Sequence, residues 1–421
     1  NRTLRFGFCG NLDLRIIYLK VRGSYGEVGN DQIGGDRFLY LPSSYGAASD
    51  SGVNKYNFGL ASNPYTSLMI VENKIGNPDL TWEKAKKMNV GVDINLFNNC
   101  LTASFDIFKE KRNNILANRS TSPMIIGANL PAYNFGEMEN RGWEMDLNFR
   151  HHIQDFHYWA RFNYSFARNE IIYMDEVQKR YDYQMTTGRR KNQFFGLIFD
   201  GYYNSWEEIN ALDRPKSSWS GNQLQPGDVK YVDVNQDGVI DDYDMVPIGY
   251  TPVPEIIYGF SFGAQYKGFD FSILFQGADN VSIKYFGRSM WPFAKGEESA
   301  KSLIKERWTQ ERYEAGEKIT FPRLSLNPNG ETDHNYRPST LWIRDASYLR
   351  LKNLEVGYTF TGGFVKRLNL NSVRLYFNGS NLFTWTDVVD LDPEAPSRSG
   401  NVEINTYPLQ KVYNIGLNIN F

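Results

Sequence analysis

Apolar and polar residues alternate with a period of two over long stretches of this 421-residue chain. In the stretch 156–166, the odd-numbered positions are mostly polar, whereas the even-numbered positions carry Phe156, Tyr158, Ala160, Phe162, Tyr164 and Phe166. Successive side chains of a β-strand point to opposite faces of the sheet, so the pattern predicts a strand with one apolar and one polar face. The stretch from Tyr413 to Phe421 repeats it.

Further runs of this kind predict about ten strands of about ten to fifteen residues each. They begin with a weaker run at Leu19 and continue near residues 88–94, 101–107, 143–149, 258–262, 269–275, 349–360 and 373–377. The run from Leu349 to Phe360 changes phase near Asn353, which predicts a β-bulge. Strands of globular proteins average about five or six residues, whereas a tilted strand needs about nine to eleven to cross a membrane.

The gaps between the predicted strands alternate between short and long. Short turns are expected at 98–100, 152–155, 267–268 and 361–371, and long gaps at 29–83, 113–136, 169–256, 280–345 and 385–411. Outer-membrane barrels have short periplasmic turns and long extracellular loops, and a soluble sandwich has no reason to keep its long loops at one end. We therefore expect an all-β, transmembrane antiparallel β-barrel with long extracellular loops and with Phe421 at the periplasmic rim.

Composition agrees with this fold class and excludes several functions. Aromatic residues make up 15% of the chain and the mean hydropathy is -0.50, which a barrel with a polar lumen and polar loops would show. A net charge of -2 suggests no nucleic-acid partner. No apolar stretch is long enough for a transmembrane helix. The nucleophile-elbow, phosphate-loop and C-x-x-C motifs do not occur, so we expect no enzyme.

Several segments resemble the SusC/RagA-type TonB-dependent transporters of the outer membrane. They are Leu19 to Gly26, Asn77 to Lys84, Arg307 to Thr309, Phe321 to Leu324, Ala346 to Asn353 and Asn378 to Thr384, in the order in which that family has them. The resemblance covers nearly the whole chain from about residue 19. It identifies residues 1–421 as the C-terminal part of the barrel of such a receptor.

The resemblance implies a larger protein and a function. A barrel of this family has 22 strands and a plug in its lumen, so the plug and the N-terminal strands would lie outside this chain. The expected function is TonB-dependent import of oligosaccharides or peptides through the outer membrane of a Gram-negative bacterium. The implied partners are TonB, a SusD-like surface lipoprotein that acts as a lid, and outer-membrane lipid. Two alternatives remain open: a surface glycan-binding or adhesive β protein without transport, and a calcium-stabilised extracellular enzyme.

One motif in a long gap predicts a structural calcium site. Residues 233–244 follow the spacing of a calcium loop, which places oxygen ligands at positions 1, 3, 5, 7, 9 and 12 and a glycine, here Gly238, at position 6. The corresponding ligands are Asp233, Asn235, Asp237, the Val239 carbonyl, Asp241 and Asp244. The alternative is a turn built from Asp and Asn side chains without any metal.

Aromatic residues in the long gaps are candidates for substrate contact, because flat apolar rings stack on sugar rings. These residues are Tyr202, Tyr203, Trp206, Trp219 and Trp291, and plain packing is the alternative for each. Leu303, Ile304 and Trp308 lie at helical spacing, which predicts a short helix between Glu297 and Tyr313 that packs on its loop or contacts the lid lipoprotein.

Overall fold

The computed structural model of the protein describes most of the chain. The described residues are 4–6, 9–12, 16–31, 39–41, 45–47, 55–60, 62, 65–72, 76–121, 130–219, 224–285, 291–293, 302–325, 333–389, 391–394, 401–402 and 409–421.

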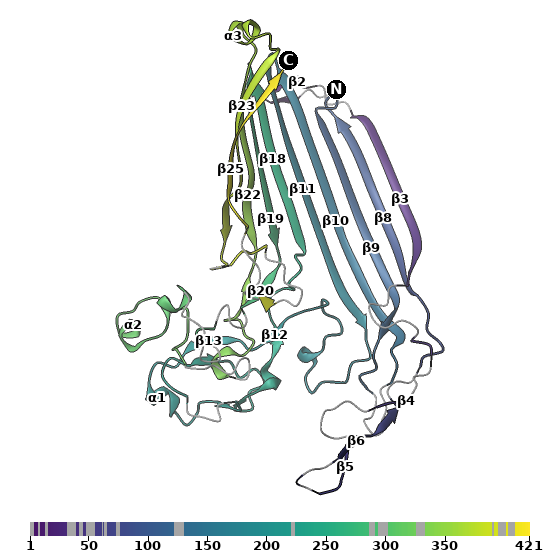
Figure 1. The fold of residues 1–421 in the computed structure, drawn as a ribbon, viewed down its shortest axis with the longest axis vertical. Coiled ribbons are helices and arrows are strands. Elements are labelled where there is room, and N and C mark those ends of the chain that lie inside the picture. Colours follow the sequence, from purple (N-terminus) through teal and green to yellow (C-terminus); the bar gives the residue numbers. More distant parts are fainter. Residues whose placement is uncertain are drawn as a thin grey trace.

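Ten long strands form one antiparallel sheet, in which each inner strand pairs with the long strand before it and the long strand after it (Figure 1). The strands are β3 (Ile16–Asn30), β8 (Glu83–Leu96), β9 (Leu101–Ala117), β10 (Tyr133–Ile153), β11 (Phe156–Tyr173), β18 (Ile256–Tyr266), β19 (Phe269–Asp279), β22 (Tyr348–Phe360), β23 (Ser372–Thr386) and β25 (Val412–Asn420). Strands β3 and β25 form the two edges of this sheet. The prediction of ten strands in simple up-and-down order is confirmed.

The pairing register brings the apolar positions of neighbouring strands together on one face. One row runs across the sheet from β3 to β22, and we call it the apolar belt: Leu19, Ile94, Ala103, Leu147, Phe162, Phe260, Phe275 and Leu351. The next row lies on the opposite face and is mostly polar: Lys20, Asp93, Ser104, Asp146, Asn163, Gly259, Gln276 and Arg350. The sheet therefore separates an apolar from a polar environment.

A second row of the apolar face is aromatic and lies at one end of the sheet. Cross-strand pairs join Phe156 to Tyr266, Tyr266 to Phe269, and Phe269 to Tyr358. Aromatic rings collect at the two membrane–water boundaries of outer-membrane barrels. The row is therefore expected to mark one of those boundaries.

Turns at this end are short and connections at the other end are long (Figure 1). Two-residue turns at Gln154–Asp155 and Lys267–Gly268 join β10 to β11 and β18 to β19. Gln154, Lys267 and Gly268 have φ angles of 54°, 45° and 86°, as tight hairpins require. We call this the short-turn end; the connection 361–371 at this end carries the helix α3 (Gly363–Arg367).

The predicted bulge is present at Lys352. Residue Leu274 of β19 pairs with Asn353 and Phe275 pairs with Leu351, so Lys352 is the extra residue. The extra residue restores the alternation, and Leu354 and Val356 join Leu351 on the apolar face. Predicted strand lengths were too short for β9, β10 and β11, which have 17, 21 and 18 residues. These strands continue toward the long loops because each keeps a hydrogen-bonded partner there.

The long connections after β11 and β19 fold together into a small domain, which we call the loop domain. Its short strands and helices are β12 (Phe195–Gly196), β13 (Phe199–Tyr202), α1 (Trp206–Ile209), β14 (Lys216–Ser217), β15 (Val229–Tyr231), β16 (Val239–Ile240), β17 (Val246–Pro247), β20 (Ser282–Tyr285), α2 (Gln310–Glu314) and β21 (Ile343–Asp345). Strand β24 (Asn401–Val402), from the connection after β23, pairs with β20. The loop domain lies below the sheet in Figure 1.

The loop domain has its own hydrophobic core. Buried members include Leu197, Val229, Tyr231, Tyr285, Trp291, Trp308, Phe321, Tyr336, Leu341 and Trp342. Tyr336 and Trp342 stack with ring centroids 5.3 Å apart, and the Trp342 Nε1 donates a hydrogen bond of 2.8 Å to the Asn335 carbonyl. Burial of this much apolar surface stabilises the connections against one another.

Smaller elements complete the described chain. These are β1 (Leu4–Phe6) with β2 (Cys9–Leu12), β4 (Tyr45–Ala47) with β7 (Ile70–Glu72), β5 (Lys55–Phe58) with β6 (Tyr65–Leu68), and 3-10 turns at Asp182–Gln184, Asp242–Asp244, Ser302–Glu306 and His334–Tyr336. None of the helices within these described ranges is both long and apolar enough to cross a membrane.

The single helix expected between Glu297 and Tyr313 is wrong for the described residues 302–313. A 3-10 turn ends at Glu306, and α2 begins only at Gln310. Trp308 lies between them outside any helix and donates its backbone N–H to the Phe321 carbonyl. The Thr309 hydroxyl caps α2 by accepting the Arg312 N–H. The Trp308 ring is buried in the loop-domain core, and that burial overrides the helical spacing. Residues 297–301 lie outside the described part.

Candidate functional site

The polar face of the sheet carries ion pairs that cross between strands. The Arg22 guanidinium lies 3.1 Å from Asp93 and 2.6 Å from Asp106. At the other side of the sheet, Arg374 pairs with Asp270 and, at 2.6 Å, with Glu355. Charged side chains on one face and the apolar belt on the other fit a wall with water on one side and lipid on the other.

A cavity of about 420 Å³ opens on this polar face. Its acidic lining includes Asp106, Glu144 and Asp146, and Asn163 and Ser165 add amide and hydroxyl groups. The Ser165 hydroxyl donates to Glu144 at 3.3 Å. These carboxylate, amide and hydroxyl groups can form hydrogen bonds to a polar solute.

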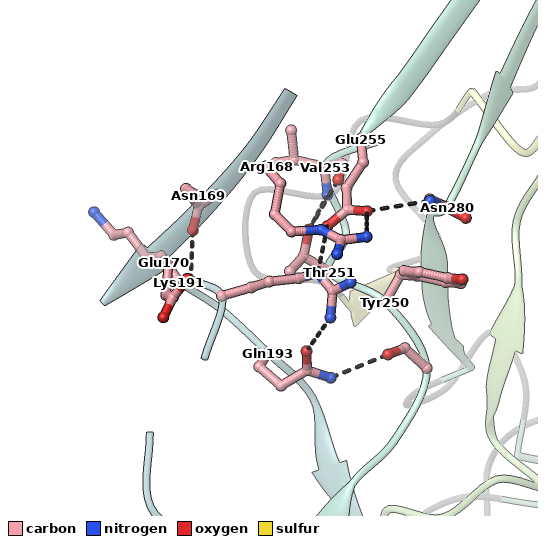
Figure 2. Close-up of polar contacts among 12 residues, drawn as sticks. Arg168, Asn169, Glu170, Lys191, Gln193, Tyr250, Thr251, Val253, Glu255 and Asn280 are labelled. Atoms are coloured by element: carbon pink, nitrogen blue, oxygen red, sulfur yellow. Dashed lines mark hydrogen bonds and ion pairs between the residues drawn. The ribbon is translucent and has the colours of Figure 1, made fainter. Parts of the chain in front are cut away.

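The polar face meets the loop domain at a cluster around Glu255 (Figure 2). The Arg168 Nε and Nη2 donate to the two carboxylate oxygens of Glu255 at 3.0 and 2.8 Å. The Arg190 Nε also donates to this carboxylate, and the Asn280 side-chain amide donates to it at 3.1 Å. We call these four residues the rim cluster; it joins β11, the connection 174–255 and the start of the connection after β19.

The Glu255 side chain is only 4% exposed, and two arginines compensate for its burial. Burial raises the pKa of the Glu255 carboxyl, but the hydrogen bonds and charges of Arg168 and Arg190 outweigh burial and hold this pKa below its ordinary value. The group is therefore a stable anion at neutral pH. Paired, hydrogen-bonded charges of this kind fix geometry between segments far apart in the chain.

Next to the rim cluster, the connection 174–255 covers the free edge of β11. Strand β11 continues to Tyr173, beyond the residues that pair with β18. There the Ile171 N–H donates to the Arg189 carbonyl at 2.8 Å, and the Gly188 N–H donates to the Ile171 carbonyl at 2.7 Å. A cavity of about 330 Å³ lies between this covering segment and the polar face, lined by charged residues that include Glu110, Arg112, Arg190 and Glu255.

A second attachment fixes the connection after β23. Arg350, on the polar face of β22, donates to Asp392 at 2.5 Å and to Glu394 at 2.8 Å. Lys352, the bulged residue, reaches the same Glu394 at 3.2 Å. Two cations of one strand thus hold one carboxylate, and these contacts join residues 392–394 to the polar face.

Inside the loop domain, Asp228 links three segments. Arg323 lies 2.6 Å from its carboxylate, and the Asn335 amide donates to it at 2.8 Å. Nearby, the ring of His334 contacts the Val229 carbonyl at 2.8 Å and the Ser217 hydroxyl at 3.0 Å. Burial lowers the pKa of His334, which keeps the ring neutral. These contacts are structural.

The predicted calcium motif forms a turn in which its side chains accept backbone hydrogen bonds. Asp233 accepts from the N–H groups of Gln236 and Gly238 at 2.7 and 2.8 Å, and Asp237 accepts from Val239 at 3.0 Å. Asp244 is fully buried and accepts from Val234 and Asp241 at 2.8 and 2.9 Å. Burial raises the pKa of Asp244, and these backbone hydrogen bonds oppose the rise.

The fit of this turn to calcium is incomplete. Both oxygens of Asp244 already face backbone donors, and no group of three or more His, Cys, Asp or Glu in the described part of the chain is placed to hold a metal ion. The geometry is that of a turn fixed by Asp and Asn side chains. Calcium binding by Asp233, Asn235, Asp237, Val239, Asp241 and Asp244 stays a prediction.

The aromatic residues that were predicted to contact substrate differ in their burial. Tyr202, Tyr203 and Trp291 are buried, and Trp219 packs against the loop-domain core with the Arg337 guanidinium 4.1 Å from its ring centroid. Trp206, on α1, is 50% exposed. Packing accounts for the first four in this conformation, which leaves Trp206 as the ring of this set that is open to a ligand.

Sequence reasoning missed the rim cluster. Glu255 is 87 positions from Arg168 and 65 from Arg190. No spacing rule joins residues so far apart. The one available signal is that Glu255 directly precedes an apolar alternating run, where a buried carboxylate would need a partner.

Comparison with known proteins agrees with this architecture. Residues 17–382 match the family model described as TonB dependent receptor-like, beta-barrel. The chain is 28% identical over 421 residues to TonB-dependent receptor P3 of Formosa agariphila, covering 96% of this chain and 39% of that protein. It is 26% identical over 409 residues to TonB-dependent receptor SusC of Bacteroides thetaiotaomicron, covering 96% and 37%.

Among solved structures, the RagAB peptide importer in its open-open state has the same fold, with a TM-score of 0.67. The two sequences are 23% identical, and the match covers 96% of this chain and 40% of that chain. The chain thus spans about two fifths of the length of the relatives it matches. Because the family model matches most of the sequence, this chain belongs to the TonB-dependent receptor β-barrel family.

Proposed function

We propose that this chain forms part of the wall and of the extracellular loops of a TonB-dependent importer in the outer membrane of a Gram-negative bacterium. The transported substrate is an oligosaccharide or a peptide, and a SusD-like surface lipoprotein is the partner at the loop domain. The names of the relatives support this proposal, since they include SusC and a peptide importer. It includes no catalytic step.

The observation that carries the proposal is the separation of the two faces of the sheet. The apolar belt continues without a charged residue from β3 to β22, while ion pairs such as Arg22–Asp106 lie on the opposite face. An aqueous path through lipid needs this arrangement, because a charge on the lipid face costs about 2–4 kcal/mol at the midplane. The short-turn end would then face the periplasm, and the loop domain would face the exterior.

The fixed shape of the loop domain supports the proposal of a large substrate and of a partner protein that acts as a lid. Its core and the rim cluster give the long connections a fixed shape, although mobile loops would suffice for a simple pore. A rigid surface can hold a second protein in a constant orientation. The cavities of about 420 and 330 Å³ on the polar face would then lie on the path from the loop domain along the wall.

The test is uptake of fluorescent oligosaccharides and peptides by cells with and without the gene. Import that requires the gene and stops when a protonophore collapses the proton-motive force would support the proposal. Binding to the cell surface without internal accumulation would contradict transport and favour a surface-binding protein. Affinity purification in detergent should also recover a lipoprotein, and its absence from mild extracts would remove the lid from the proposal.

A further inference from the structure

At the short-turn end, the connection 361–371 does not form a simple turn but carries the helix α3. The helix buries Val365, while Phe364 and Leu368 are 75% and 55% exposed. Its last turn contains Lys366 and Arg367. Neither basic side chain has an ion-pair partner within the part of the chain that the structure describes.

Helix α3 shares a cavity with residues of the apolar face of the sheet. Phe269 lies on the same face as Phe275 of the apolar belt and pairs with Tyr358, and Phe360 follows two positions later on that face. Phe360 in turn pairs with Val373. A cavity of about 400 Å³ is lined by Phe360, Val373, Phe364 and Val365 together with Gly362 and Gly363. The two strand residues that line the cavity, Phe360 and Val373, therefore belong to the apolar face and not to the polar face.

An apolar cavity lined by the first residues of α3 and two cations in the last turn of the same helix match the two parts of a phospholipid. The lining of the cavity suits an acyl chain, and Lys366 and Arg367 suit the phosphate. Interfacial helices hold lipid in this way, with apolar side chains in the acyl region and basic ones at the headgroups. The aromatic row formed by Phe156, Tyr266, Phe269 and Tyr358 lies at the same end of the sheet.

We propose that α3 and the adjoining ends of β22 and β23 bind a phospholipid of the periplasmic leaflet. The ligand's phosphate lies between Lys366 and Arg367, and one acyl chain enters the cavity beside Phe360 and Val373. The inference rests on the membrane position of the sheet but not on transport or on any substrate. A failure of the uptake experiment would therefore leave it intact.

The test is native mass spectrometry of the complete protein, extracted in detergent and titrated with phosphatidylglycerol. The double variant Lys366→Gln/Arg367→Gln should bind the lipid about fivefold more weakly for each charge removed. Phe364→Ser should weaken binding as well. The matched control is Lys267→Gln, which removes a cation from another turn at the same end and should bind like wild type.

Each variant is first checked for the heat-modifiable gel migration of a folded barrel. Equal lipid binding by wild type and the double variant would overturn the proposal. A loss of about fivefold in Lys267→Gln, equal to the loss per charge in the double variant, would also overturn it, because the effect would then follow overall charge and not α3. Protection of α3 by a co-purifying protein, with no bound lipid, would assign the surface to a protein partner instead.

Discussion

Glu255 is the residue at which β11, the connection 174–255 and the connection after β19 meet. Its carboxylate accepts hydrogen bonds from Arg168, Arg190 and Asn280 (Figure 2). Replacing Glu255 by Gln keeps the shape but leaves two arginines without their anion. We expect a local loss of about 1–3 kcal/mol, measured as faster hydrogen exchange in residues 188–193. The exposed Glu314→Gln is the control, and unchanged exchange in Glu255→Gln would contradict the role of the cluster.

The same group predicts a pH dependence. Since the two arginines hold the pKa of Glu255 below its ordinary value, the folded state binds this proton more weakly than the unfolded state does. The stabilisation is therefore complete above the ordinary glutamate pKa and is lost as pH falls through the lowered value. Protease resistance of the connection 174–255 should decrease on acidification in wild type. If the protease resistance of wild type changes with pH as little as that of Glu255→Gln, the titration of Glu255 has no effect on this connection.

Asp237 allows a test of the calcium prediction. Its carboxylate accepts the Val239 N–H and would be the fifth-position ligand of the motif. Asp237→Ala should loosen residues 233–244 and abolish any protection from protease that added calcium provides. The wild-type protein with and without a chelator gives the reference. If protection is identical in both conditions, the motif acts as a bare turn, which agrees with the hydrogen bonds that Asp233 and Asp244 already accept.

At the scale of elements, the apolar belt makes a prediction about single strands. Phe162 belongs to the belt, and its neighbour Asn163 lies in the polar row. Phe162→Arg should hinder barrel assembly at a cost of about 2–4 kcal/mol, whereas Asn163→Arg should be tolerated. Heat-modifiable migration of the outer-membrane fraction measures both. Equal assembly of the two variants would contradict the assignment of Phe162 to the lipid face and of Asn163 to the polar face.

The strands were predictable because alternation is local information. The alternating residues of 156–166 and the phase change near Asn353 each determine which face a residue takes, and both features are present in the structure. The long connections gave weaker signals, because their structure depends on tertiary contacts. Trp308 shows this, since burial in the loop-domain core replaced the expected helix. The contact of Arg190 with Glu255 was likewise inaccessible to any local rule.

On the scale of the whole molecule, the protein consists of a sheet and a loop domain that are stabilised by different means. The sheet depends on cross-strand pairing and, in the proposed setting, on lipid around the apolar belt. The loop domain depends on a water-excluding core built from connections far apart in the sequence. Arg350 and the rim cluster are attachments between these two parts. Damage to the core should therefore spare the sheet.

Trp342 tests that separation. Its ring is 2% exposed, stacks on Tyr336 and donates a hydrogen bond to the Asn335 carbonyl, so Trp342→Ala creates a cavity and removes this bond. We expect a loss of about 3–5 kcal/mol that opens the loop domain to protease while heat-modifiable migration stays normal. Trp206→Ala removes a half-exposed ring from α1 and should leave the loop domain closed. If Trp342→Ala also loses the heat-modifiable migration of the barrel, the sheet and the loop domain fold as one cooperative unit. Import would then depend on the loop-domain core because barrel assembly needs it, and not because of the surface that the loop domain presents.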